Sequence, residues 1–151
     1  MRQVRHDELL YHLFDATHGW MPSLRKGLAL DAERRAQWVE IGASAVAERL
    51  RHFYFFPDGE PAPLNGKELA AVFAKSINGW RHMLRVDFTS GQDQVRRRAR
   101  WTAAYLLADD LANYQILSEL PEPPPFRLYG DAGSGVASRD ELPTPIGPLF
   151  G

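Results

Sequence analysis

The stretch "WTAAYLLADDLANYQIL", residues 101–117, decides the fold class. Its apolar residues fall on every side of a helical wheel drawn at about 100° per residue. A helix that is apolar all round is covered by other elements on more than one side. We therefore expect this stretch to lie at the centre of a helical bundle.

Polar residues interrupt this apolar helix at Asp109, Asp110 and Asn113. A buried carboxylate is costly unless it is paired or protonated. The two aspartates are therefore expected either to fix the register of the bundle through a buried polar contact or to belong to a ligand pocket. If the chain binds a small molecule, the predicted ligand-binding residues are Asp109, Asp110, Asn113 and Tyr114.

Outward from this stretch, three further segments show helical periodicity. With the central helix extended at both ends, the predicted ranges are 2–18, 31–54, 66–86 and 92–120. Asp31 and Asn65 stand where N-caps are expected, residues 19–27 are predicted to be a connector, and no internal repeat is evident. The predicted fold is all-α: a compact bundle of about four main helices over residues 1–120.

Residues 121–151 differ in character from the bundle. They contain seven of the eleven prolines and five of the twelve glycines, which is incompatible with a long helix or the interior of a sheet. They also contain Phe126, Tyr129 and Phe150, whereas disordered tails are usually poorer in apolar residues. We expect an irregular Pro/Gly-rich tail that docks on the bundle or on a partner.

The segment 66–86 allows two interpretations. "SING", residues 76–79, could be the turn of a helix-turn-helix that reads DNA with Arg81, His82 and Arg85. Drawn as one straight helix, however, its large apolar residues share a single arc. A turn would destroy that agreement, so we predict one continuous amphipathic helix.

The stretch "HDELLYHLFDATH", residues 6–18, places Glu8, His12 and Asp15 on one helix face at i, i+4 and i+7. Such a cluster could bind a metal inside a bundle. The apolar residues of the stretch lie on the opposite side, so the cluster is predicted to be a polar face in solvent, and no metal site is predicted.

Composition restricts the function further. The formal net charge is −1 and cysteine is absent. These values argue against a global attraction to nucleic acid or a membrane surface and exclude a disulfide framework. Because no run approaches the roughly 18 apolar residues of a transmembrane helix and no signal peptide is evident, we expect a cytoplasmic protein. The only basic run, "RRRARW" at 96–101, is interpreted as a patch for an acidic partner, with Arg96, Arg97 and Arg100 as candidates.

No Gly-rich phosphate loop, nucleophile elbow or metalloprotease motif is present. The favoured function is therefore a non-catalytic helical interaction protein: an accessory subunit, an inhibitor or an oligomeric adaptor that binds another protein or a second copy, without a cofactor. Phe126, Tyr129 and Phe150 are further partner-binding candidates. The first alternative is a helical-bundle enzyme, or a protein that binds a metal or small ligand through the carboxylates of the fourth helix. The second is a nucleic-acid binder that uses Arg96–Arg100.

Overall fold

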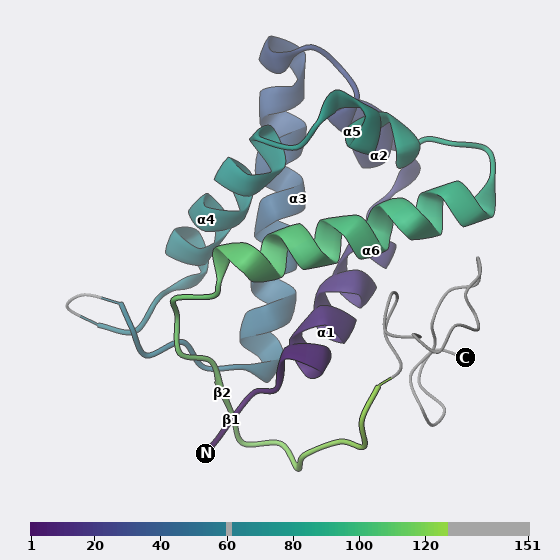
Figure 1. Ribbon diagram of the computed structural model, residues 1–151. Coiled ribbons are helices and arrows are strands. Elements are labelled where there is room, and N and C mark those ends of the chain that lie inside the picture. The colour runs from purple at the N-terminus through teal and green to yellow at the C-terminus, as the bar shows by residue number, and fades with distance from the viewer. Residues whose placement is uncertain (60–61, 127–151) are drawn as a thin grey trace.

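The computed structural model describes residues 1–59 and 62–126. In this part of the chain, six helices and one antiparallel strand pair form the fold (Figure 1). In chain order the elements are β1 (Arg2–Gln3), α1 (His6–His18), α2 (Pro22–Leu28), α3 (Ala32–Phe53), α4 (Gly66–Asn78), α5 (His82–Asp87), α6 (Asp93–Asp110) and β2 (Leu117–Ser118). The predicted all-α helical bundle is confirmed.

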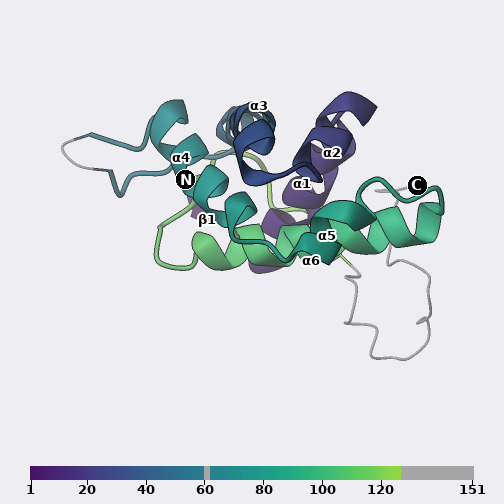
Figure 2. The same cartoon turned by 90° about the horizontal axis from the view of Figure 1, so that it is seen from above.

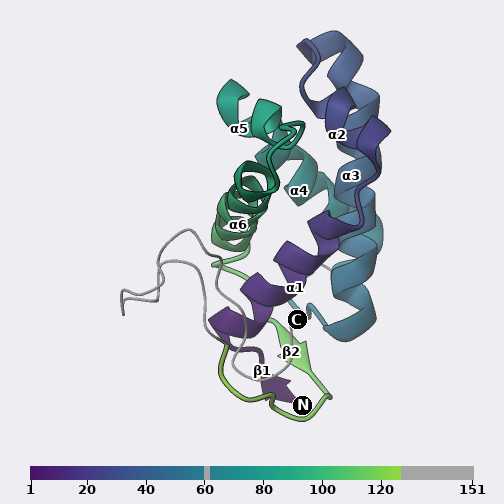
Figure 3. The same ribbon diagram turned by 90° about the vertical axis from the view of Figure 1, so that its right-hand side faces the viewer.

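The helices are arranged in two layers (Figures 2 and 3). α3 packs against α1, α2 and α4, and α6 runs across one face of this layer, in contact with α1, α4 and α5. Trp101 of α6 is fully buried and stacks on Phe14 of α1, with 4.2 Å between ring centroids. The opposite side of α6, with Thr102 and Leu106, is exposed. The prediction that this helix is central and covered all round is therefore wrong, because the first layer packs on only one of its sides.

Side-chain caps fix where α3 and α4 begin. The Asp31 carboxylate accepts a hydrogen bond from the backbone N–H of Arg34 at 3.1 Å, as predicted for an N-cap. Asn65 and Glu68 cap each other's backbone N–H groups reciprocally, at 2.8 and 2.9 Å. Both predicted caps are confirmed, since each satisfies an N–H that the helix leaves without a partner.

The predicted continuous helix over 66–86 is wrong. The chain turns at Gly79, and Arg81 is extended (φ −63°, ψ 147°) as the N-cap of α5. The turn places Trp80 against Phe88 and leaves Met83 63% exposed, although a single wheel assigns Met83 to the apolar arc. Tertiary packing of Trp80 therefore outweighs the local periodicity that predicts one helix.

The first and last helices of the chain, α1 and α6, are shorter than predicted, because the residues before α1 and after α6 pair as strands. Arg2–Gln3 pairs antiparallel with Leu117–Ser118, and Phe55 forms a further bridge to Leu117. The first helix accordingly starts at His6, and α6 ends at Asp110. The strand pair ties the start of the chain to the segment after α6.

The two halves of the described chain have the same order of elements, although the sequence shows no evident repeat. α1–α2–α3 and α4–α5–α6 each consist of a 13-residue helix, a short helix and a long helix. The related stretches are "GWMPSLR" at 19–25, where α2 was predicted to be a connector, and "GWRHMLR" at 79–85. The halves interlock: α1 packs on α6, α3 packs on α4, and the rings of Trp20 and Trp80 approach to 6.4 Å. The two stretches share Gly, Trp, Leu and Arg at four of their seven positions, and the tertiary structure shows that the likeness extends to the order of the helices.

The contact of α2 with α3 depends on a glycine. A Cβ atom on Gly27 would lie 2.1 Å from Cγ of Trp38, inside the indole ring. We expect Gly27→Ala to lower the free energy of unfolding by about 1–3 kcal/mol, because a rigid ring must be displaced. Urea denaturation followed by circular dichroism measures this. Gly91→Ala, at a position with no atom within 4 Å, is the matched control and should change stability by less than about 0.5 kcal/mol; equal losses in both variants would contradict the prediction.

Candidate binding cleft

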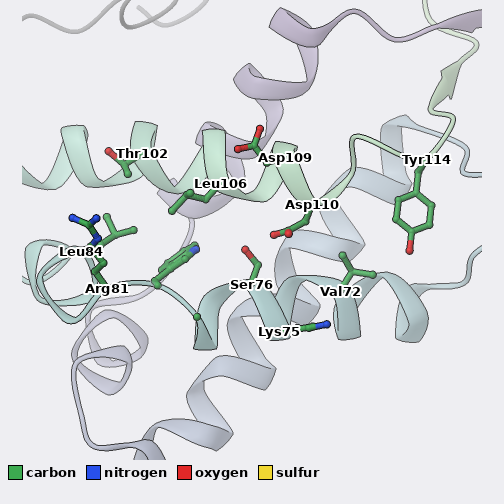
Figure 4. A pocket seen from close by; sticks show the side chains of 12 residues that line it. Val72, Lys75, Ser76, Arg81, Leu84, Thr102, Leu106, Asp109, Asp110 and Tyr114 are labelled. Atoms are coloured by element: carbon green, nitrogen blue, oxygen red, sulfur yellow. The ribbon is translucent and has the colours of Figure 1, made fainter.

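A cleft of about 870 Å³ lies between α4, α5 and α6 (Figure 4). This volume lies within the range of roughly 300–1,000 Å³ that is typical of ligand sites. The residues that line it are Val72, Lys75, Ser76, Gly79, Trp80, Arg81, Leu84, Thr102, Leu106, Asp109, Asp110 and Tyr114. The cleft is thus built from the second half of the chain.

The apolar part of the cleft is formed by Trp80, Leu84 and Leu106. Trp80 is buried and stacks on Phe88, with 5.8 Å between the ring centroids and 3° between the planes. Leu106, on α6, is 36% exposed. Because stacking holds Trp80 in place, an apolar group that enters here meets a preformed surface.

Charges of both signs surround this apolar part. Lys75 and Arg81 come from α4 and the turn after it, whereas Asp109 and Asp110 come from the last turn of α6. Figure 4 shows the Asp110 carboxylate on the side of Ser76, and that of Asp109 on the opposite side of the α6 ribbon. None of the four charged groups forms an ion pair with another residue of the described ranges. They are therefore free to meet charges on a ligand.

Three of the four predicted ligand-binding residues meet at this cleft: Asp109, Asp110 and Tyr114 line it, and Asn113 does not. Both aspartates are exposed. The expectation of a buried carboxylate that fixes the helix register is therefore wrong, because α6 packs on the other layer through only one side.

The exposure of the two aspartates gives a direct prediction. We expect the double variant Asp109→Asn/Asp110→Asn to unfold with a free energy within about 0.5 kcal/mol of the parent, because exposed substitutions without partners have small effects. Chemical denaturation measures it. A loss of more than about 2 kcal/mol is the size expected for a broken buried polar contact. Such a loss would show that the aspartates fix the helix register after all.

Sequence reasoning missed Lys75, Ser76 and Arg81 as parts of the site. Lys75 and Ser76 look like ordinary polar positions of an amphipathic helix. Arg81 reaches the cleft only because the chain turns at Gly79. Helical periodicity contains no signal for either placement.

The basic run at 96–101 is divided between different environments. Arg96 pairs with Asp93 at 3.0 Å and donates to the carbonyl of Ser90 at 2.7 Å. The guanidinium of Arg100 lies 3.8 Å from the centroid of the Phe14 ring and donates to the Phe14 carbonyl, and burial lowers its pKa to about 10. Arg97 is half-buried. The predicted arginine patch is thus reduced, since Arg100 is directed into the bundle.

Residues 121–126, the described start of the tail, dock on the bundle. The sequence predicts docking either on the bundle or on a partner. Arg5 pairs with Glu122 at 2.7 Å and donates to the carbonyl of Pro123 at 2.8 Å. Phe126 is buried and stacks on Tyr11, with 4.9 Å between centroids. Phe126 is therefore part of the fold and is not available to a partner, which corrects its predicted role. Tyr129 and Phe150 lie outside the described residues.

The predicted solvent-exposed face of Glu8, His12 and Asp15 is wrong. Glu8 is 3% exposed and forms two hydrogen bonds with Arg2, at 2.7 and 2.9 Å. His12 lies against the rings of Phe53 and Tyr54, and Asp15 pairs with Arg49. The strand pair and the end of α3 cover this face, which the helical wheel of one helix cannot show.

Within the described ranges, no three histidine, aspartate or glutamate side chains gather as a group that could hold a metal ion. None of the helices found there is both long enough and apolar enough to span a membrane. Comparison of the chain with protein-family models, curated proteins and solved structures finds no match. The function is therefore inferred from the geometry of the cleft.

Proposed function

We propose that this chain is a non-catalytic interaction protein and that its α4–α5–α6 cleft holds a segment of a partner polypeptide. The observation that supports this proposal is the combination of a preformed apolar surface at Trp80 with the unpaired charges of Lys75, Arg81 and Asp110 beside it. Binding hot spots in protein interfaces combine these features: a buried aromatic anchor, arginine, and a polar rim.

The arrangement of the charges indicates the chemistry of the partner. An apolar side chain of the partner would pack between Trp80 and Leu106, where burial gives about 25 cal/mol per Å² of apolar area. Acidic groups of the partner would lie near Lys75 and Arg81, and basic groups near Asp110. Complementary charges of this kind set the orientation of a bound segment more than its affinity.

One observation favours the alternative of a small-ligand protein or enzyme. Asp109, Asp110 and Tyr114 line the same cleft, and its volume of about 870 Å³ would admit a small molecule. The Asp109→Asn/Asp110→Asn variant separates the two functions. Loss of all binding would favour a small ligand held by the carboxylates, whereas a modest loss, with most affinity kept by the apolar contact, would favour a polypeptide.

We expect Leu106→Arg to weaken partner binding at least about tenfold, or about 1.4 kcal/mol, because it places a charge on the apolar surface of the cleft. The partner is first identified with a photo-crosslinking residue at position 106, and its affinity is then measured by calorimetry. Native mass spectrometry shows whether the captured partner is a second copy of the chain.

Ile41→Arg is the matched control. Ile41 is 44% exposed and lies on α3, away from the cleft-lining residues. Both variants should keep the stability of the parent within about 0.5 kcal/mol. Equal affinities of the two variants, or equal crosslinking from positions 41 and 106, would contradict the proposal.

A further inference from the structure

Two buried arginines differ from every other buried polar residue of the described ranges. Glu8 is ion-paired, and Thr17 and Ser118 form hydrogen bonds through their hydroxyl groups. Arg35 and Arg85 are 9% and 8% exposed, and neither has a carboxylate partner among the described residues. A buried charge without a counter-charge is costly, so it requires an explanation.

The two side chains are held in the same way. Arg35 donates through Nη1 to the carbonyl of Leu30 at 3.0 Å, and Arg85 donates through Nη1 to the carbonyl of Trp80, in each case five residues earlier in the chain. The Nε atoms of both arginines are buried and have no acceptor. Each guanidinium has five N–H donors; Nη1 is held by a backbone carbonyl, and the buried Nε–H has no acceptor.

Both arginines belong to the end of the bundle where the two short helices meet. α2 packs against α3, which carries Arg35, and against α5, which carries Arg85 (Figure 1). Burial lowers the pKa of Arg85, and the positive charge of Arg35 lowers it further. The two guanidinium groups therefore act on each other as like charges, and neither is ion-paired with a described carboxylate.

We propose that Arg35 and Arg85 form a binding site for one small oxyanion of the phosphate class, at the junction of α2, α3 and α5. A guanidinium binds two oxygens of such an anion through parallel N–H donors, and the anion compensates both positive charges at once. The high burial of both residues favours a compact ion or a terminal phosphate group over the backbone of a nucleic acid. Neither arginine lines the cleft, so phosphate binding and partner binding can be measured separately.

The test follows the Nε–Hε resonances of the arginines by NMR while inorganic phosphate is added to the full chain. We expect saturable shifts of two buried arginine resonances, and a rise in the melting temperature, that sodium chloride at equal ionic strength does not reproduce. Shifts that are linear, or the same in chloride, would overturn the proposal. Glycerol phosphate distinguishes a phosphate monoester from the free ion as the ligand. Saturable shifts with glycerol phosphate show that a monoester enters the site, whereas the absence of shifts restricts the site to the free ion.

Substitution gives the second measurement. Arg85→Lys keeps the charge but loses the planar fork, so we expect phosphate affinity to fall about tenfold. Arg34→Lys is the control, because Arg34 is exposed and already paired with Asp31. Unchanged affinity in a folded Arg85→Lys variant would overturn the assignment, and the titration of the parent protein decides it if that variant does not fold. Duplex DNA that shifts the same two resonances would overturn the choice of a small anion.

Discussion

Replacing Glu8 by alanine is expected to lower the free energy of unfolding by about 2 kcal/mol, because it removes a buried carboxylate that holds the half-buried guanidinium of Arg2. Glu8 is 3% exposed and holds Arg2 through two hydrogen bonds. It also accepts from the backbone N–H of Arg5 at 3.0 Å, which satisfies the first turn of α1. The substitution therefore removes an ion pair and a cap together.

Arg2 connects this pair to the rest of the fold. Its guanidinium also donates to the carbonyls of Leu120 and Pro121, at 2.8 and 3.1 Å. We therefore expect Glu8→Ala to loosen the described start of the tail as well, seen as faster amide exchange of Ser118 and Leu120. Arg34→Ala, which breaks an exposed pair with Asp31, is the control, and its cost should stay below about 1 kcal/mol. A cost for Glu8→Ala no larger than that of the control would contradict the prediction.

The same pair makes the fold sensitive to acid. Burial alone would raise the pKa of Glu8. The hydrogen bonds from Arg2 and from the Arg5 backbone N–H, together with the charges of both arginines, outweigh burial, and the net pKa lies below its usual value of 4.5. The folded carboxyl group therefore binds a proton less readily than the unfolded one. Its contribution to stability is present above pH 4.5 and is lost as the pH falls through the lowered folded value.

The second large effect is expected at His12. Burial lowers the pKa of its imidazole from 6.5 to about 4 in the folded state, whereas in the unfolded chain the imidazole keeps the ordinary pKa of 6.5. Between these values the unfolded state binds a proton that the folded state does not, so stability falls as the pH is lowered from 6.5 to 4. The difference of about 2.5 units corresponds to about 3 kcal/mol at 1.36 kcal/mol per unit.

Urea denaturation at a series of pH values measures this loss. His12→Phe keeps the aromatic contacts with Phe53 and Tyr54 but cannot be protonated, so its stability should change about 3 kcal/mol less than that of the parent between pH 6.5 and 4. His52→Gln is the control, since His52 is exposed. Parallel stability curves for the parent and His12→Phe would show that His12 does not contribute to the acid sensitivity.

The fold class and much of the local structure can be predicted from the amino-acid sequence. The range of α3, and the caps Asp31 and Asn65, follow from apolar periodicity and from side chains that bind free N–H groups. These interactions join residues that are only a few positions apart, so the amino-acid sequence shows both partners. The aspartates of α6 were also identified as candidate site residues, because carboxylates in an apolar helix are uncommon.

Which helix faces are covered depends on how the helices pack in three dimensions. A wheel shows that one side of a helix is apolar, but the neighbour that packs on it comes from distant sequence. The strand pair and the end of α3 cover Glu8 and His12, which the wheel assigns to solvent. The open side of α6 exposes Asp109 and Asp110, which the wheel assigns to the core. The turn at Gly79 and the docking of Phe126 likewise depend on partners far along the chain, which local patterns cannot identify.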